Sequence, residues 1–305
     1  MPCIIEKNIK IVKLLTLFCF YFLIFHHNAQ ADAWTQKKQS LLLITTMNIL
    51  SFNSTTSLGT FNPKQRVLQA QYILYGEYGL TDGITFGGKI IANDNFLSKN
   101  NSFFHKSTHR SFGLDGGQIF GRFKIYQNNF FVISVSQLIQ SPSVYKDNEA
   151  SYFSIKYWQY EPKLEIGFNI KKHTFSTISF GWHGNIKNWY DEMHLDITLG
   201  HYFSSEIMFL LQFQKYIFYI KQNNKHTTLN YNLINIPIYD LITKKGFSKI
   251  TISFVFNVDK NIKFGLGLFT TIQTNKAKKQ NLNIDLYGGF ISLWFLFGQN
   301  SSTRD

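Results

Sequence analysis

Hydrophobic and polar residues alternate with a period of two along most of this chain. The pattern is clearest from Arg66 to Asn93, where two alternating arms of about ten residues flank the turn Thr81-Asp82-Gly83. Alternation on both sides of a short Asp-Gly turn predicts an antiparallel β-hairpin. Each arm is longer than the usual strand of about five or six residues. It matches the roughly 9–11 residues that a tilted strand needs to cross a bilayer.

The same unit repeats through the rest of the chain. Short turns are expected near residues 82, 128, 172, 204 and 260, and longer polar loops alternate with them, including 97–113, 141–158 and 222–246. Outer-membrane barrels have short periplasmic turns and longer external loops. We therefore predict an all-β chain, a single transmembrane antiparallel up-and-down β-barrel of about twelve strands over residues 32–305. The first strand is expected at 38–52, the fourth at 117–126, the fifth at 130–140 and the twelfth at 284–297.

Charged residues gather on one face of the predicted strands, and apolar residues on the other. Alternation alone fits a soluble barrel with an apolar core as well as a membrane barrel with an apolar outer face. Strand length, an N-terminal targeting segment and the alternation of turns with loops favour the membrane barrel. The residues then predicted to line the lumen are Glu77, Lys89, Arg122, Lys124, Glu161, Lys163, Glu165, His183, Glu192, His194, Asp196 and Lys263. The residues predicted to face lipid are Leu74, Phe86, Leu164, Ile166, Phe168, Phe180, Leu195, Ile197, Leu211, Phe254 and Leu266.

The first 31 residues form the targeting segment. Three lysines precede an apolar run at 14–25 (LLTLFCFYFLIF), and small-x-small cleavage sites end at Ala31 and Ala33. This order predicts a secretory signal peptide at 1–31, cleaved after Ala31 or Ala33. The alternative, a short membrane anchor, is disfavoured because the apolar run is too short to span a bilayer as a helix.

Composition agrees with a barrel whose two faces differ. Aromatic residues make up 17% of the chain and charged residues only 16%, against about 25% charged in an average soluble domain. Both cysteines, Cys3 and Cys19, lie in the signal peptide, so the mature chain would contain no disulfide. The net charge of +13 could attract anions, but the abundance of Lys, Asn, Ile and Phe also fits an AT-rich genome. We expect no nucleic-acid partner.

Three short segments resemble parts of known proteins. AWTQKKQS (33–40) and YGEYGLTDGITFGGK (75–89) resemble segments of porin-like, largely uncharacterised outer-membrane β-barrels of the alphaproteobacterial type. LWFLF (293–297) resembles the terminal strand that barrel-assembly machinery binds, although a polar tail follows it here. The resemblance implies a place in the bacterial outer membrane, in contact with its lipids, and no fixed activity. Aromatic residues near predicted strand ends would form interfacial belts: Tyr75, Tyr78, Trp158, Tyr160, Trp182, Trp189, Tyr190 and Tyr202.

Two groups of residues could carry chemistry. His105-Lys106-Ser107 and its repeat, residues 109–111, place a base near a hydroxyl, as in twelve-stranded outer-membrane phospholipases, but no third residue orients the base. Glu192, His194 and Asp196, with His183 on the neighbouring strand, could bind a metal. Alternate residues of a strand lie about 7 Å apart, so an ion-pair ladder with Lys163 is the better interpretation.

No cofactor, metal or catalytic residue is therefore predicted, and no nucleotide-binding, metalloprotease or nucleophile-elbow motif is present. The leading hypothesis is a pore or transporter for small solutes. The alternatives are a surface interaction protein that binds through its loops and an outer-membrane hydrolase.

Overall fold

The computed structural model describes residues 33–54, 66–98, 109–145, 158–171, 173–185, 190–220, 248–272 and 284–298. Within these ranges the chain forms twelve long strands and one two-residue strand, all antiparallel to their neighbours. The strands are β1 (Leu41–Ser54), β2 (Arg66–Thr81), β3 (Ile84–Ser98), β4 (His109–Gln127), β5 (Phe131–Gln140), β6 (Val144–Tyr145), β7 (Gln159–Lys171), β8 (Thr174–Asn185), β9 (Tyr190–Tyr202), β10 (Ile207–Ile220), β11 (Ser248–Asp259), β12 (Ile262–Ile272) and β13 (Ile284–Phe297). No helix among the described residues is long and apolar enough to cross a membrane.

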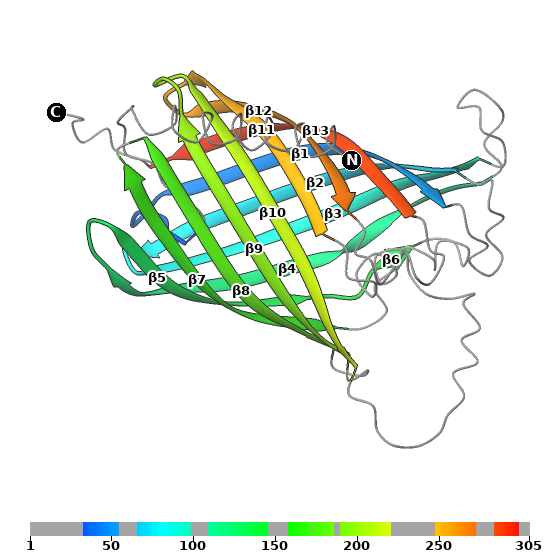
Figure 1. The fold of residues 1–305 in the computed structure, drawn as a ribbon, viewed down its shortest axis with the longest axis horizontal. Helices are drawn as coiled ribbons and strands as arrows, with labels where there is room; N and C mark the ends of the chain where they lie inside the picture. Colours follow the sequence, from blue (N-terminus) through cyan, green and yellow to red (C-terminus); the bar gives the residue numbers. More distant parts are fainter. Residues whose placement is uncertain are drawn as a thin grey trace, which may run out of the picture.

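The twelve long strands close into a barrel (Figure 1). Each pairs with the long strands before and after it in the sequence, and β1 pairs with β13 along its whole length, from Leu41 opposite Phe297 to Ser54 opposite Ile284. The short strand β6 pairs with the first half of β4. The predicted fold class and strand number are confirmed. Closure gives every long strand a partner on each side, so backbone N–H and C=O groups along the paired lengths are hydrogen-bonded.

Large apolar side chains cover the outside of the barrel. A row of them crosses β5, β7, β8 and β9 at one level, because Ile133 pairs with Ile166, Ile166 with Ile178, and Ile178 with Ile197. Among the residues predicted to face lipid, the following are exposed: Leu74, Phe86, Leu164, Phe180, Phe254 and Leu266. The others lie at the same alternating positions and are half-buried by their neighbours: Ile166, Phe168, Leu195, Ile197 and Leu211.

The predicted loop 97–113 is wrong at both ends. Strand β3 continues to Ser98, and β4 begins at His109, because the β3–β4 ladder extends to Leu97 opposite His109. A bulge lies opposite the step from Ile90 to Ala92, and Gly116 within it has a φ of 92°. The bulge shifts the alternation of inward and outward residues by one position. The sequence pattern therefore indicated a strand only for the residues that follow the bulge.

Candidate functional site in the barrel lumen

Inward-facing residues are identified by contacts between strands that are not neighbours. Arg122 on β4 reaches Glu77 on β2 and Glu165 on β7, although β3 and β5 separate these strands. Likewise, His194 on β9 contacts Glu161 on β7 across β8. Such contacts form only through the concave side of the wall. Alternation then places Lys89, Lys124, Lys163, His183, Asp196 and Lys263 on the same side. The side chain of Glu192 lies outside the described part of the chain.

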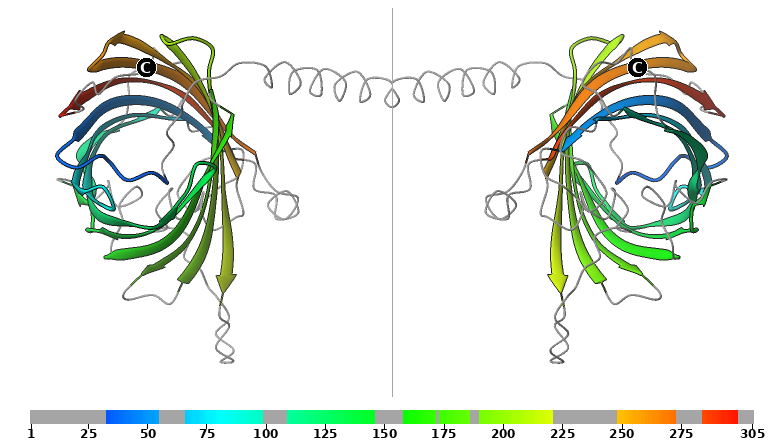
Figure 2. Two further views of the ribbon diagram at one scale, coloured as in Figure 1. Left: turned by 90° about the vertical axis from the view of Figure 1, so that its left-hand side faces the viewer. Right: turned by 90° about the vertical axis from the view of Figure 1, so that its right-hand side faces the viewer.

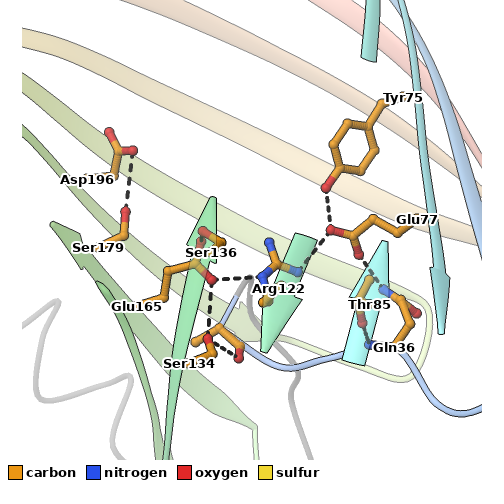
Figure 3. Close-up of polar contacts among 11 residues, drawn as sticks. Gln36, Tyr75, Glu77, Thr85, Arg122, Ser134, Ser136, Glu165, Ser179 and Asp196 are labelled. Carbon is orange, nitrogen blue, oxygen red and sulfur yellow. Dashed lines mark hydrogen bonds and ion pairs between the residues drawn. The ribbon is translucent and has the colours of Figure 1, made fainter. Parts of the chain in front are cut away.

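Arg122 is the centre of the first ion network (Figure 3). Its Nε lies 2.8 Å from Glu165 Oε2 and its Nη1 2.9 Å from Glu77 Oε1. Ser136 donates to Glu165 Oε1 at 2.9 Å. Tyr75 also donates to Glu77 Oε1. The three charged side chains are almost fully buried, and a buried ion pair is tolerable only when its charges are matched and hydrogen-bonded in this way.

Glu161 is the centre of a second network, further along the wall. Its carboxylate lies 3.2 Å from Lys163 Nζ, 3.6 Å from His183 Nδ1 and 2.8 Å from His194 Nδ1. The other ring nitrogen of His194 lies 2.9 Å from Asp196 Oδ1. Among the described residues no group of three or more His, Cys, Asp or Glu side chains could hold a metal ion. The histidines therefore belong to a chain of ion pairs and hydrogen bonds.

Lys89 and Lys249 lie on the inner face outside both ion networks, as does Lys124. Among the described residues, neither Lys89 nor Lys249 forms a salt bridge. Lys249 lies over the ring of Phe269, with its Nζ 4.5 Å from the centroid. Charges of both signs act on Lys89: Lys163 and Lys249 repel it, and Asp115 and Glu161 attract it. The sequence analysis did not name Lys249 as a lumen residue. Lys249 precedes the outward-facing Ile250 on the same strand, so the alternation could have placed it on the inner face.

Amide side chains line another part of the interior. Asn48 donates to Gln71 at 2.8 Å, and Gln71 donates to Asn93 at 3.1 Å, so the three form a ladder across β1, β2 and β3. Gln118 and Gln140 form a similar pair on β4 and β5, at 2.9 Å. The ladders keep the inner wall polar and hydrogen-bonded without net charge.

Residues 33–40, just before β1, fold into the barrel at its short-turn end. Figure 2 shows this segment, in blue, inside the outline of the barrel. Gln36 lies beside β2 and β3, where its backbone N–H donates to Thr85 Oγ1 at 2.8 Å. Ala33 is fully buried, and its carbonyl accepts a hydrogen bond from Ser134 on β5 at 2.9 Å. The predicted first strand, 38–52, is found at Leu41–Ser54 instead, because residues 38 and 39 form a turn in which Gln39 has a φ of 62°.

Apolar side chains also fill part of this end. Phe175, Met208 and Val255 are buried together, and Tyr202 and Trp294 pack against them. All five alternate with outward-facing residues on their strands, so they point inward. Tyr202 therefore does not belong to an interfacial belt, and neither does Tyr75, which hydrogen-bonds inside the first network.

The structure does not test the doubled His-x-Ser sequence. Its first copy, 105–107, lies outside the described residues, and the side chains of His109 and Ser111 are likewise outside the described part.

One comparison with a solved structure supports the barrel fold. The chain is similar in structure to an outer membrane channel from Pseudomonas putida F1, with a TM-score of 0.59 and 7% sequence identity over 88% of this chain and 99% of that one. It is also similar to the CymD monoaromatic hydrocarbon channel (TM-score 0.48, 6% identity, 86% and 89% covered). A third similar structure is the translocator domain of the autotransporter NalP from Neisseria meningitidis (TM-score 0.48, 8% identity, 86% and 90% covered). No protein-family model and no curated protein matches the sequence.

Proposed function

We propose that this protein is a narrow outer-membrane pore or transporter for small solutes. The observation that carries the proposal is the contrast between the two faces of a closed barrel. Side chains such as Leu74 and Leu164 are exposed on the outside, while Arg122 and Glu161 are buried in ion networks inside. A lipid-facing apolar surface around a polar lumen is the arrangement of outer-membrane pores. The channel named in the first structural comparison agrees with this role.

The proposed route to the membrane begins with a signal peptide at 1–31, which lies outside the described residues. Its removal is supported by the position of Ala33, which is buried inside the short-turn end. Cleavage after Ala31 retains the hydrogen bond between Ala33 and Ser134. N-terminal sequencing of membrane-extracted protein should give Asp32, or Trp34 if cleavage follows Ala33. A chain that still begins at Met1 would contradict this route.

The proposed partners are outer-membrane lipids and the barrel-assembly machinery during biogenesis. Strand β13 supports the second, because it ends at Phe297 in the aromatic run LWFLF. We also propose the alphaproteobacterial barrel type, on the resemblance of 33–40 and 75–89. The role is proposed to be non-enzymatic, because the described lumen carboxylates Glu77, Glu161 and Glu165 are held by cations or hydrogen-bond donors.

Conductance tests the proposed function most directly. Mature protein refolded into detergent should show β-type circular dichroism and should migrate faster on electrophoresis without boiling than after it. Reconstituted into a planar bilayer, it should give discrete conductance steps in potassium chloride. Protein that folds by both criteria and gives no conductance at any voltage, with or without residues 33–36 in place, would refute the pore.

The packed apolar cluster at the short-turn end favours a second candidate, a surface interaction protein that uses the barrel as an anchor. Phe175, Met208 and Val255 leave part of the interior unavailable to water. The regions that would bind a partner, 141–158 and 222–246, lie largely outside the described residues. Binding of a cell-surface ligand by a barrel that never conducts would support this candidate.

A further inference from the structure

Residues 33–36 contact the inner wall like a bound peptide. Ser134 donates to the carbonyl of Ala33 at 2.9 Å, and the backbone N–H of Gln36 donates to Thr85 Oγ1 at 2.8 Å. The side-chain amide of Gln36 donates to Glu77 Oε2, also at 2.8 Å. The segment thus uses a backbone carbonyl at one end and both backbone and side-chain groups at the other. Its partners lie on β2, β3 and β5, which are rigid parts of the closed barrel.

The indole of Trp34 fits a position that only glycine leaves open. Gly167 on β7 faces inward, and a Cβ atom placed there would lie 2.3 Å from Trp34 Cζ3 and 2.9 Å from the Cβ of Ala33. No real Cβ atom approaches another atom so closely, so the missing side chain of Gly167 makes room for the ring. Shape and hydrogen bonding therefore coincide on the same four residues.

The site also belongs to the first ion network. Glu77 binds Gln36 through Oε2 and Arg122 through Oε1, and Ser134 contacts Glu165 Oε2 at 3.3 Å as well as Ala33. Figure 3 shows Gln36 and Ser134 on opposite sides of Arg122. The segment therefore runs along the inner wall past Arg122, from β2 and β3 to β5 and β7. It occupies part of the cross-section of the lumen at the short-turn end.

We propose that Gly167, Ser134, Thr85 and Glu77 form a peptide-binding site in the lumen. Its ligand is an extended segment with a small residue and an aromatic residue, followed by a glutamine two positions later. The chain's own residues 33–36 occupy the site and narrow the pore, and their release widens it. The narrowing rests on the proposed function, but the binding site does not.

The residues between this segment and β1 have hydrogen bonds of their own to the first hairpin. Release of residues 33–36 therefore need not unfold the barrel. Gln39 and Ser40 exchange backbone hydrogen bonds with Gly79 at 2.8 and 2.9 Å, and Lys38 donates to Asp82 at 3.0 Å. These contacts continue the β1–β2 ladder toward the first turn. Residues 38–40 thus stay bound to the first hairpin when 33–36 leave the wall, a step that also breaks the hydrogen bond from Thr35 Oγ1 to the carbonyl of Asp82 at 2.6 Å.

The decisive variant removes the ligand groups and keeps the chain length. In mature refolded protein, Trp34→Gly, Thr35→Gly and Gln36→Gly are combined, and folding is verified by the heat-dependent shift in electrophoretic mobility. A fluorescent peptide with the sequence AWTQKKQS should bind this variant, as measured by anisotropy. It should bind wild type at least several-fold more weakly, because there the site is filled. A scrambled peptide of the same composition is the control for nonspecific binding.

Conductance measures the second half of the proposal. The variant should conduct several-fold more than wild type, and AWTQKKQS added to it should restore the smaller value. Gly167→Ala should act in the same direction, because its methyl group displaces Trp34. Gly121→Ala is the matched control, because its new Cβ faces outward at an ordinary 3.4 Å from Phe86.

Each result decides one part of the proposal. Equal peptide binding by wild type and the triple variant, or no binding by either, would overturn the binding site. Peptide binding without a conductance difference would overturn the narrowing and leave the site. A complete absence of conductance in all proteins, with peptide binding intact, would refute the pore and not the site.

Discussion

Replacing Arg122 by methionine should destabilise the barrel strongly. The guanidinium bridges Glu77 and Glu165 at 2.9 and 2.8 Å, and the three side chains are only 5–7% exposed. Without Arg122, two buried carboxylates lose their counter-charge. Breaking a buried ion pair by removing one partner costs about 3–5 kcal/mol. The guanidinium also lies 5.7 Å from the ring centroid of Phe120, a contact that contributes up to about 1 kcal/mol.

A variant in which the whole network is uncharged separates two contributions to the loss of stability, the uncompensated charge and the lost packing. Combining Arg122→Met with Glu77→Gln and Glu165→Gln removes all three charges, and replacing a whole buried ion network by neutral groups is often close to neutral in stability. The triple variant should therefore recover most of the lost stability. Lys124→Met, two residues along the same strand, is the control. Among the described residues, Lys124 makes one exposed hydrogen bond, to Gln127, and its loss should change stability by less than about 0.5 kcal/mol.

Urea unfolding of refolded protein in detergent micelles, followed by tryptophan fluorescence, measures these differences. The midpoint should fall markedly for Arg122→Met, hardly at all for Lys124→Met, and partly return in the triple variant. If Arg122→Met is no less stable than Lys124→Met, water reaches the network and the burial argument is wrong. If the triple variant is as unstable as the single one, packing and not charge was responsible.

Two further predictions concern the two faces of the wall. Ile166→Arg should destabilise the barrel in lipid vesicles by roughly 2–4 kcal/mol, because it places a charge on the outward face near the middle of β7. Gly167→Arg should displace Trp34 inside the lumen and change conductance, and a larger stability loss there than at Ile166 would contradict the assigned facing. Changing Lys89 and Lys249 together to Gln should shift the reversal potential in a potassium chloride gradient toward cation selectivity. Lys215→Gln, on the outward face of β10, should leave the reversal potential unchanged, and a shift of the same size there would remove the two lumen lysines from the explanation.

Local alternation determined much of the architecture from the sequence. The last strand was expected at 284–297 and is found at Ile284–Phe297. The hairpin turn at Asp82 also lies where the pattern placed it. Such features depend on side chains that alternate across one strand, so a period of two within a short window is enough to reveal them. The pattern was lost at Gly116, where a bulge moves the following residues to the other face.

Contacts between distant strands were decided only by the tertiary structure. Arg122 is 45 residues from Glu77 and 43 from Glu165, so no local pattern can pair them. They meet because closure of the barrel turns β2, β4 and β7 toward a common interior. The place of Trp34 has the same origin. The sequence placed Trp34 only between a cleavage site and the first predicted strand, and its binding position exists only once β7 presents Gly167 to the lumen. The residues of the lumen are thus visible in the sequence, whereas their partners depend on curvature and closure of the sheet.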